Sequence, residues 1–318
     1  MIKKFVPILL GSLLLASCQN QGPSENTLRI VTPLGAPSAI MYDQGSNADW
    51  DAKAPVNLPA ELQGNFYDVV VFDALTGLES IRKNNLDFVL AKVVTGGNFF
   101  LMGVNTDDIP TSESKIVSFQ KDKAPDKVFL NLANEKWGLG SNLNIEYVTG
   151  DVSSTAAVLK TGKFNGQPVD YVLSAEPVIT SVKNSLDEGV SLTEIYNMRT
   201  EWKEKYNQDA IVQAGVFVRK SSISSKNALL SDFMRKLESR CDILVSNPEI
   251  AANCLNEYSA DLDTQKNRFG INANVLKALQ SGNKNRLGII QTSETVDVNV
   301  FLETLGQVGY PSTYFVNI

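Results

Sequence analysis

The run Val69-Val70-Val71-Phe72 constrains the fold more than any other feature of this sequence. Four consecutive apolar residues, three of them β-branched, are typical of a strand that is buried on both faces of a parallel sheet. An apolar stripe of helical spacing follows at 75–81, and further strands are expected at 88–94 and 99–104. Strand, helix and strand in this order imply right-handed crossovers, so we predict an α/β fold with mostly parallel sheets.

A second unit of the same kind begins near residue 105. Strands are expected at 145–148, 171–173 and 212–218, with helices between them, and the remainder of the chain reads as mostly helical. The chain has 318 residues, a length that suits two domains of ordinary size.

Histidine is absent from the sequence. Its absence excludes Ser-His-Asp and Cys-His catalysis, imidazole-ligated metals and a histidine pH switch. The formal charge is −6, and an acidic protein lacks the basic face that phosphate binding needs, so no nucleic-acid partner is expected. We predict neither a metal site nor a cofactor.

The N-terminus has the three-part layout of a secretory signal: basic residues, an apolar run, then small residues before Cys18. The sequence Leu-Ala-Ser-Cys at 15–18 resembles a bacterial lipobox. That resemblance implies cleavage after residue 17, a lipid on Cys18 and a tether over 18–26, which would hold the protein to a membrane outside the cytoplasm. The alternative is an ordinary cleaved signal. No later segment approaches the length of a membrane span.

Two further cysteines, Cys241 and Cys254, fall on apolar stripes of two adjacent predicted helices. Outside the cytosol a disulfide can form, and a bridge across this short loop would contribute about 3 kcal/mol. We expect the bridge, and two reduced core thiols are the alternative.

Several segments together resemble the bacterial solute-binding lipoproteins of ABC importers. They are, in order, residues 28–37 (LRIVTPLGAP), 67–71 (YDVVV), 93–98 (VVTGGN), 123–126 (KAPD), 160–163 (KTGK) and 175–177 (AEP). The resemblance is to the type-II periplasmic-binding fold, in the group that binds sulfonates, nitrate and thiamine precursors. It implies two α/β lobes with a ligand cleft between them, and an ABC permease with its ATPase as partners. We expect a monomer.

The resemblance also implies two crossings between the lobes, which we expect near 102–104 and 214–216. Lobe 1 would then comprise 27–103 plus 217–318, and lobe 2 would comprise 104–216.

In open parallel sheets, ligands bind beyond the carboxyl ends of the strands, where glycines admit a close approach and helix N-termini offer free N–H groups. The loops at these ends carry small polar groups and a few acids. The candidate ligand-binding residues are Gly35, Ala36, Ser38, Tyr42, Asp73, Thr76, Thr95, Gly96, Gly97, Asn98, Asp126, Ser153, Ser154 and Glu176.

None of these loops contains arginine, the residue that usually binds an oxyanion in bidentate fashion. The sequence therefore favours a neutral or cationic small molecule, such as a heterocycle similar to a thiamine precursor, over a sulfonate or nitrate. A surface sensor with the same lobes and an enzyme that uses Asp73 with Glu176 as an acid–base pair remain as alternatives.

Overall fold

The β-branched run becomes strand β3 (Val69–Asp73), the centre of the first of two five-stranded sheets. The computed structural model describes residues 26–47, 49–140 and 142–318. The order of the first sheet is β2 (Trp50–Lys53), β1 (Ile30–Pro33), β3, β12 (Ala214–Arg219) and β4 (Phe88–Thr95). Only β12 runs antiparallel to its neighbours, so the other four strands end at the same edge.

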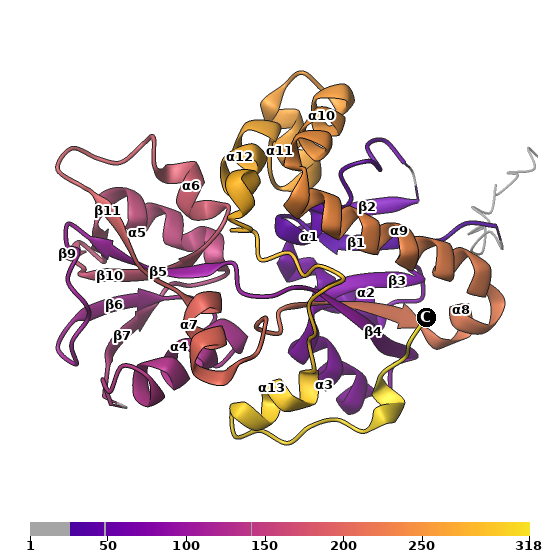
Figure 1. Cartoon of the computed structure of the whole chain (residues 1–318), viewed down its shortest axis with the longest axis horizontal. Coiled ribbons are helices and arrows are strands. Elements are labelled where there is room, and N and C mark those ends of the chain that lie inside the picture. The colour runs from indigo at the N-terminus through magenta and orange to yellow at the C-terminus, as the bar shows by residue number, and fades with distance from the viewer. Residues whose placement is uncertain (1–25, 48, 141) are drawn as a thin grey trace, which may run out of the picture.

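The second sheet repeats this plan with one reversed strand. Its order is β11 (Leu192–Asn197), β5 (Phe99–Val104), β10 (Tyr171–Ala175), β6 (Lys115–Ser118) and β7 (Asn144–Tyr147). Strand β5 is antiparallel to both of its neighbours, and the other pairings are parallel. The mostly parallel α/β architecture in two lobes, predicted from the sequence, is therefore confirmed, and Figure 1 shows the two sheets side by side with the chain passing between them. A short hairpin, β8 (Lys163–Phe164) and β9 (Gln167–Pro168), extends lobe 2.

The two crossings lie earlier in the chain than the sequence indicated. Strand β4 ends at Thr95 and β5 begins at Phe99, so the first crossing is 96–98. The second is 207–213, between helix α7 (Met198–Tyr206) and β12. By sheet membership, lobe 1 comprises 26–95 and 214–318, and lobe 2 comprises 99–206. The expected crossings at 102–104 and 214–216 lie inside strands, because both sheets continue up to the hinge with fully buried residues.

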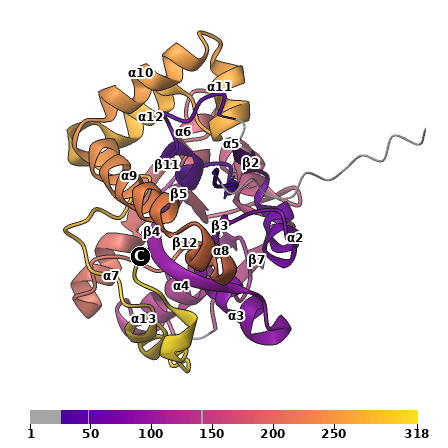
Figure 2. The same ribbon diagram turned by 90° about the vertical axis from the view of Figure 1, so that its right-hand side faces the viewer.

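Helices cover both sheets. Lobe 2 carries α4 (Ala124–Glu135), α5 (Thr155–Thr161), α6 (Val178–Val182) and α7, with the 3-10 turn η2 (Val152–Ser154). The helices of lobe 1 are α1 (Ala36–Ala39), α2 (Leu58–Gln63), α3 (Ala74–Asn84), α8 (Lys220–Ser225), α9 (Asn227–Ser246), α10 (Pro248–Tyr258), α11 (Leu262–Phe269), α12 (Ala273–Gln280) and α13 (Val298–Thr304). Its 3-10 turns are η1 (Pro55–Asn57), η3 (Ser281–Asn283) and η4 (Ser312–Tyr314). Figure 2 shows α10–α12 and the pair α3 and α13 at opposite ends of this lobe.

Residues 284–297, which we call the C-terminal strap, run from α12 to α13 alongside the hinge (Figure 1). The amide of Gly96 donates to the carbonyl of Gly288, and the amide of Ile290 donates to the carbonyl of Val94. Beyond the strap, the ring of Phe301 in α13 lies 5.2 Å from the ring of Trp202 in lobe 2. The strap therefore contacts the first crossing, and the helix after it packs on the opposite lobe.

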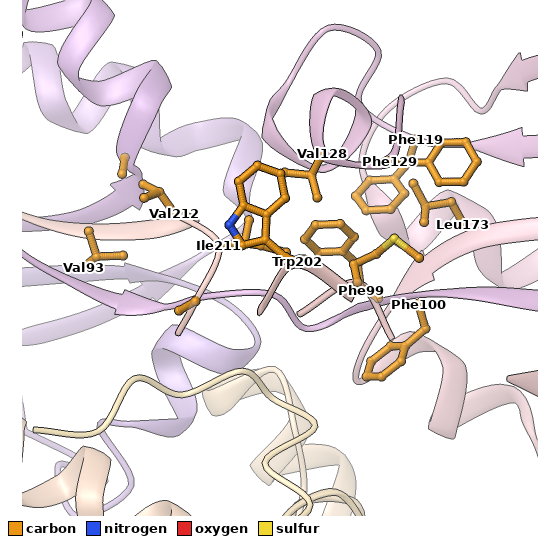
Figure 3. Close-up of a cluster of buried hydrophobic side chains, with 14 of the residues drawn as sticks. Val93, Phe99, Phe100, Phe119, Val128, Phe129, Leu173, Trp202, Ile211 and Val212 are labelled. Atoms are coloured by element: carbon orange, nitrogen blue, oxygen red, sulfur yellow. The ribbon is translucent and has the colours of Figure 1, made fainter. Parts of the chain in front are cut away.

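One apolar cluster runs through the hinge and joins the cores of the two lobes. Figure 3 shows Val93 of lobe 1 and Val212 of the second crossing on one side, with Trp202, Phe99 and Phe129 of lobe 2 on the other. A separate cluster lies under α9–α12 in lobe 1. Because the first cluster is shared, lobe movement has to occur within a packed hinge.

The two cysteines do not form the disulfide that was expected. They lie on adjacent helices as predicted, Cys241 buried in α9 and Cys254 half-buried in α10, but both are free thiols. Burial raises the pKa of the Cys241 thiol to about 12, and thiol oxidation proceeds through the thiolate. The expected bridge is not formed in the structure, and in the folded protein the Cys241 thiol is a poor nucleophile.

The predicted signal over 1–17 and the lipid-bearing Cys18 lie outside the described residues, as does the tether up to residue 25. Among the residues that are described, no helix has the length and apolar character needed to cross a bilayer.

Candidate functional site

The carboxyl end of β3 in lobe 1 and the loop that follows β6 in lobe 2 line a hollow of about 440 Å³, which we call the interlobe hollow. Asp73 and Thr76, where β3 passes into α3, form one wall. Asp122 and Lys123, which follow β6, form the facing wall together with Lys127 of α4. The floor is made by the C-terminal segment, with Leu302, Gln307 and Tyr310.

Asp73 is placed by its role as the N-cap of α3. Its Oδ1 accepts a hydrogen bond of 2.8 Å from the amide of Thr76, which satisfies one of the free N–H groups of the first turn. Burial raises the pKa of the Asp73 carboxyl, while the Thr76 bonds and the charges of Lys123 and Lys127 act in the opposite direction. The two lysines of lobe 2 therefore lie close enough to act electrostatically on an acid of lobe 1.

Asp126 lies beneath the second wall and not at its surface. It is 1% exposed, with Oδ2 accepting from the amide of Asp122 at 2.8 Å and Oδ1 accepting from the hydroxyl of Tyr147 at 2.8 Å. Burial raises the pKa of its carboxyl against these two bonds. Asp126 thus shapes the loop that carries Lys123, and in this conformation it offers little surface to a ligand.

The candidates at the first crossing form a hydrogen-bonded hinge. Gln213 of the second crossing accepts from the amide of Gly97 at 2.7 Å, and its amide group donates to the side-chain oxygen of Asn98 at 2.8 Å. Asn98 in turn donates to the carbonyl of Glu176 at 2.7 Å. Thr95 is buried and accepts from the amide of Ala214. Sequence reasoning missed Gln213, since a single glutamine in a loop carries no signal of its own.

Gly96 and Gly97 are required for packing at this crossing. A Cβ on Gly96 would lie 2.5 Å from the carbonyl oxygen of Ile211, and Gly97 has a φ of +93°. These contacts join the two crossings, so the glycines admit the neighbouring chain, and their role as ligand contacts stays a prediction.

Glu176 is, with Asp126, one of the two most deeply buried acids of the candidate set. Its carboxylate accepts from the amide and the hydroxyl of Thr180 and from Nε of Arg286, at 2.9, 3.1 and 3.0 Å. Arg286 belongs to the C-terminal strap, 110 residues further along the chain, so no local pattern pairs the two. The strand-end loops lack arginine, as the sequence showed, but the fold brings one to Glu176 from elsewhere.

Four candidates near β1 do not reach the interlobe hollow. Ser38 is fully buried, and its hydroxyl donates to the carbonyl of Pro33 at 2.7 Å. The amide of Gly35 donates to Phe269, and Ala36 is buried beside it. Tyr42 packs in the cluster under α9–α12, where burial raises its pKa to about 12. The ring of Tyr42 is enclosed by core residues in this conformation, and its role as a ligand contact stays a prediction.

Ser153 and Ser154 follow β7 in the turn η2. The amide and hydroxyl of Ser153 both donate to Asp151, and the amide of Ser154 donates to the Asp151 carbonyl. Neither serine lines the interlobe hollow. Their role as ligand contacts stays a prediction.

A larger cavity of about 970 Å³ opens beside the hinge, lined by Gly97, by α7 and by the strap. Its charged groups are largely paired. Arg199 bonds to Glu294, and Lys203 lies 3.0 Å from Asp209. Of its lining, the sequence had singled out only Gly97.

Comparison with known proteins finds the fold but no close relative. No protein-family model matches the chain, and no curated protein sequence matches it. Solved structures do match. An ABC transporter from Parabacteroides distasonis has 14% identity and a TM-score of 0.63, covering 91% of this chain and 94% of its own.

Two sulfonate-binding proteins are also similar in structure. The periplasmic aliphatic sulphonate binding protein SsuA from Escherichia coli has 14% identity and a TM-score of 0.60, covering 88% of this chain and 85% of its own. The alkanesulfonate-binding protein SsuA from Xanthomonas axonopodis pv. citri, bound to MOPS, has 12% identity and a TM-score of 0.57, covering 87% and 89%. At these identities the likeness establishes the periplasmic-binding fold.

Proposed function

We propose that this protein is an extracytoplasmic solute-binding protein that captures a small organic molecule for an ABC importer. The observation that carries the proposal is the interlobe hollow, which is lined by the carboxyl end of β3 in lobe 1 and by the loop between β6 and α4 in lobe 2. Ligand sites in open α/β sheets lie beyond such strand ends. Two lobes joined by two short crossings can close around a solute and present one closed surface to a permease.

Asp73 and Thr76 are the predicted contacts that line the hollow, and we propose both as ligand contacts. Lys123 and Lys127 join them from the facing lobe. The other candidates that remain open, Ser153 and Ser154, would require closure of lobe 2 onto the solute.

The charged side chains that line the hollow indicate which class of solute it binds. We retain a neutral or cationic molecule, such as a thiamine-precursor-like heterocycle, as the primary proposal, because Asp73 lies at the hollow and no arginine lines it among the described residues. An alkanesulfonate or similar anion is the second candidate. The two lysines favour it, and three similar structures are described as sulfonate-binding.

We further propose that Cys18 carries a lipid that holds the mature protein at the outer face of a membrane. The support is the Leu-Ala-Ser-Cys sequence behind an apolar run. Labelled palmitate should be incorporated into the wild-type protein and lost in Cys18→Ser, which should then be released from membranes. Incorporation that survives the substitution would refute the anchor.

Binding without catalysis is part of the same proposal. The acid–base pair that we considered, Asp73 with Glu176, would need an accessible Glu176 carboxylate. Its side chain is fully buried and is bonded to Thr180 and Arg286. We therefore propose no reaction at the hollow.

The test is calorimetry of the soluble chain with Cys18 replaced. The titrants are thiamine precursors, other heterocycles, amines and alkanesulfonates. We expect one class to bind with a dissociation constant near a micromolar, about −8 kcal/mol, and to reduce the radius of gyration in X-ray scattering. Native mass spectrometry of the freshly purified protein would show any solute that it retains. If no solute binds and none compacts the protein, the proposed function is wrong.

A further inference from the structure

The walls of the interlobe hollow carry charges of opposite sign. Asp73 is on the lobe 1 wall, and Lys123 and Lys127 are on the lobe 2 wall. The lysines are near enough to act on the Asp73 carboxyl, yet neither comes within 4 Å of a carboxylate oxygen anywhere in the described part of the chain. The space between the two walls, about 440 Å³, lies within the range of small-molecule sites.

Most of the other charges at the hollow are taken up by neighbours. Glu79 forms ion pairs with Arg82 and Lys83 of its own helix at 2.6 and 3.1 Å. Below the second wall, Asp126 has both oxygens bonded. Asp122 also lines the lobe 2 wall and forms no ion pair among the described residues. A solute therefore meets Asp73 on one wall and, on the other, two lysines and one aspartate, a net charge of 2 − 1 = +1.

We propose that the interlobe hollow binds a zwitterionic solute, with its ammonium group at Asp73 and its anionic group at Lys123 and Lys127. This inference rests on the proposed function and narrows its solute class. A molecule with both charges is neutral overall, which agrees with the neutral solute favoured above, and it also gives the lysines the anion that the sulfonate alternative requires.

A solute with one charge fits the hollow less well. A simple anion between the lysines would leave Asp73 facing it across a partly buried space, where like charges repel strongly. A simple cation at Asp73 would meet two lysines on the opposite wall. Because the two charge signs are on different lobes, a solute bridging them would also favour the closed arrangement of the lobes.

The experiment compares matched probes by calorimetry. The zwitterions are glycine, 3-aminopropanoate, 2-aminoethanesulfonate and trimethylammonioacetate, and each is paired with the analogue that lacks the ammonium group and with the one that lacks the anion. We expect at least one zwitterion to bind at least tenfold more tightly than both of its analogues. If every zwitterion binds no better than its singly charged analogues, the inference is wrong.

Asp73→Asn separates charge from structure. Asparagine is as good an N-cap as aspartate, so the Thr76 amide keeps an acceptor and α3 keeps its start. We expect the variant to lose zwitterion affinity at least tenfold while the affinity for the anion-only analogue stays the same or improves. Asp261→Asn, the same change at the N-cap of α11, is the control and should leave binding unchanged. Equal losses in both variants would overturn the assignment of Asp73.

The double variant Lys123→Gln with Lys127→Gln tests the other wall, and we expect the zwitterion to lose more affinity than the cation-only analogue.

The outcomes of these experiments distinguish the proposed function from the zwitterion inference. If a heterocycle or a simple sulfonate binds and compacts the protein while no zwitterion is preferred, the importer function stands and the zwitterion inference fails. If nothing in either panel binds, the importer function itself fails and the inference fails with it.

Discussion

The guanidinium of Arg286 joins the lobes, with Nε 3.0 Å from Oε1 of the buried Glu176. Its Nη1 lies 2.5 Å from Oε2 of Glu194 on β11, and the guanidinium stacks 4.1 Å from the ring centroid of Phe100 on β5. Arg286 follows α12 of lobe 1, while all three partners belong to lobe 2. One side chain therefore couples the C-terminal half of lobe 1 to the end of β10, beside the hinge.

Replacement of Arg286 should destabilise the protein and loosen the lobes. Breaking a buried pair by removing one partner costs roughly 3–5 kcal/mol, because the remaining charge stays buried. We expect Arg286→Gln to lower the urea denaturation midpoint and to increase the radius of gyration of the solute-free protein. Arg235→Gln, which breaks an exposed pair with Asp232 on α9, is the control and should change neither. An unchanged radius of gyration in Arg286→Gln would show that the pair does not couple the lobes.

Acid should weaken the protein through Asp68. Burial alone would raise the pKa of this carboxyl, but hydrogen bonds from Ser222 and the Arg29 amide, together with Lys226 at 2.9 Å, lower it overall. The pKa of Asp68 is therefore lower in the folded protein than in the unfolded chain, where it is about 3.9. Above about pH 3.9 the charged carboxylate stabilises the fold, and this stabilisation is lost as the pH falls through the pKa of the folded protein.

The corresponding variant is Asp68→Asn. We expect it to be less stable than the wild type at pH 7 and to approach the wild type as the pH falls below about 4, where the wild type also loses the charge. Thermal denaturation across this pH range measures the difference. Asp107→Asn, at an exposed loop position, should follow the wild type throughout. A stability gap that stays constant with pH would contradict the role of the carboxylate charge.

The fold was largely predictable because buried strands are apolar runs. The run at 69–72 is β3, and the strands expected at 88–94 and 99–104 are β4 and β5. Three strands of the two five-stranded sheets were missed, as was the short hairpin of β8 and β9. Two of them, β2 and β11, are edge strands that contain a mixture of polar and apolar residues. Such segments become strands because they pair with a neighbouring strand, and their composition gives little sign of it. The third, β6, contributes only Ile116 and Val117 as an apolar signal.

The candidate site was predictable only where the chain itself signals a strand end. Asp73 and Thr76 follow an unmistakable strand, and both line the interlobe hollow. Arg286 and Gln213 reach their partners over 110 and 115 residues, so the sequence around each gives no sign of the contact. Nothing near Tyr42 in sequence reveals that its ring packs in the cluster under α9–α12.

Gly96 should not tolerate a side chain. An alanine Cβ would lie 2.5 Å from the Ile211 carbonyl oxygen and 2.6 Å from Cβ of Ala210, so the two crossings would have to separate. Overpacking of this kind typically costs 1–3 kcal/mol, that is, roughly 2 kcal/mol here. We expect Gly96→Ala to lower the melting temperature and to change solute affinity. Gly64→Ala, whose Cβ would make ordinary contacts at 3.4 and 3.6 Å, is the matched control. A melting temperature equal to that of the control would show that the crossings can move apart freely.

The soluble chain should contain two free thiols. In the structure both Cys241 and Cys254 are reduced, and burial raises the pKa of both, that of Cys241 to about 12. With Cys18 replaced, alkylation of the denatured protein without reductant should add two labels per chain, as counted by mass spectrometry. In the native protein Cys254, which is half-buried, should react before Cys241, because only an exposed thiolate is a good nucleophile. A chain that accepts no label until it is reduced would establish the disulfide between Cys241 and Cys254 and contradict the free thiols of the structure.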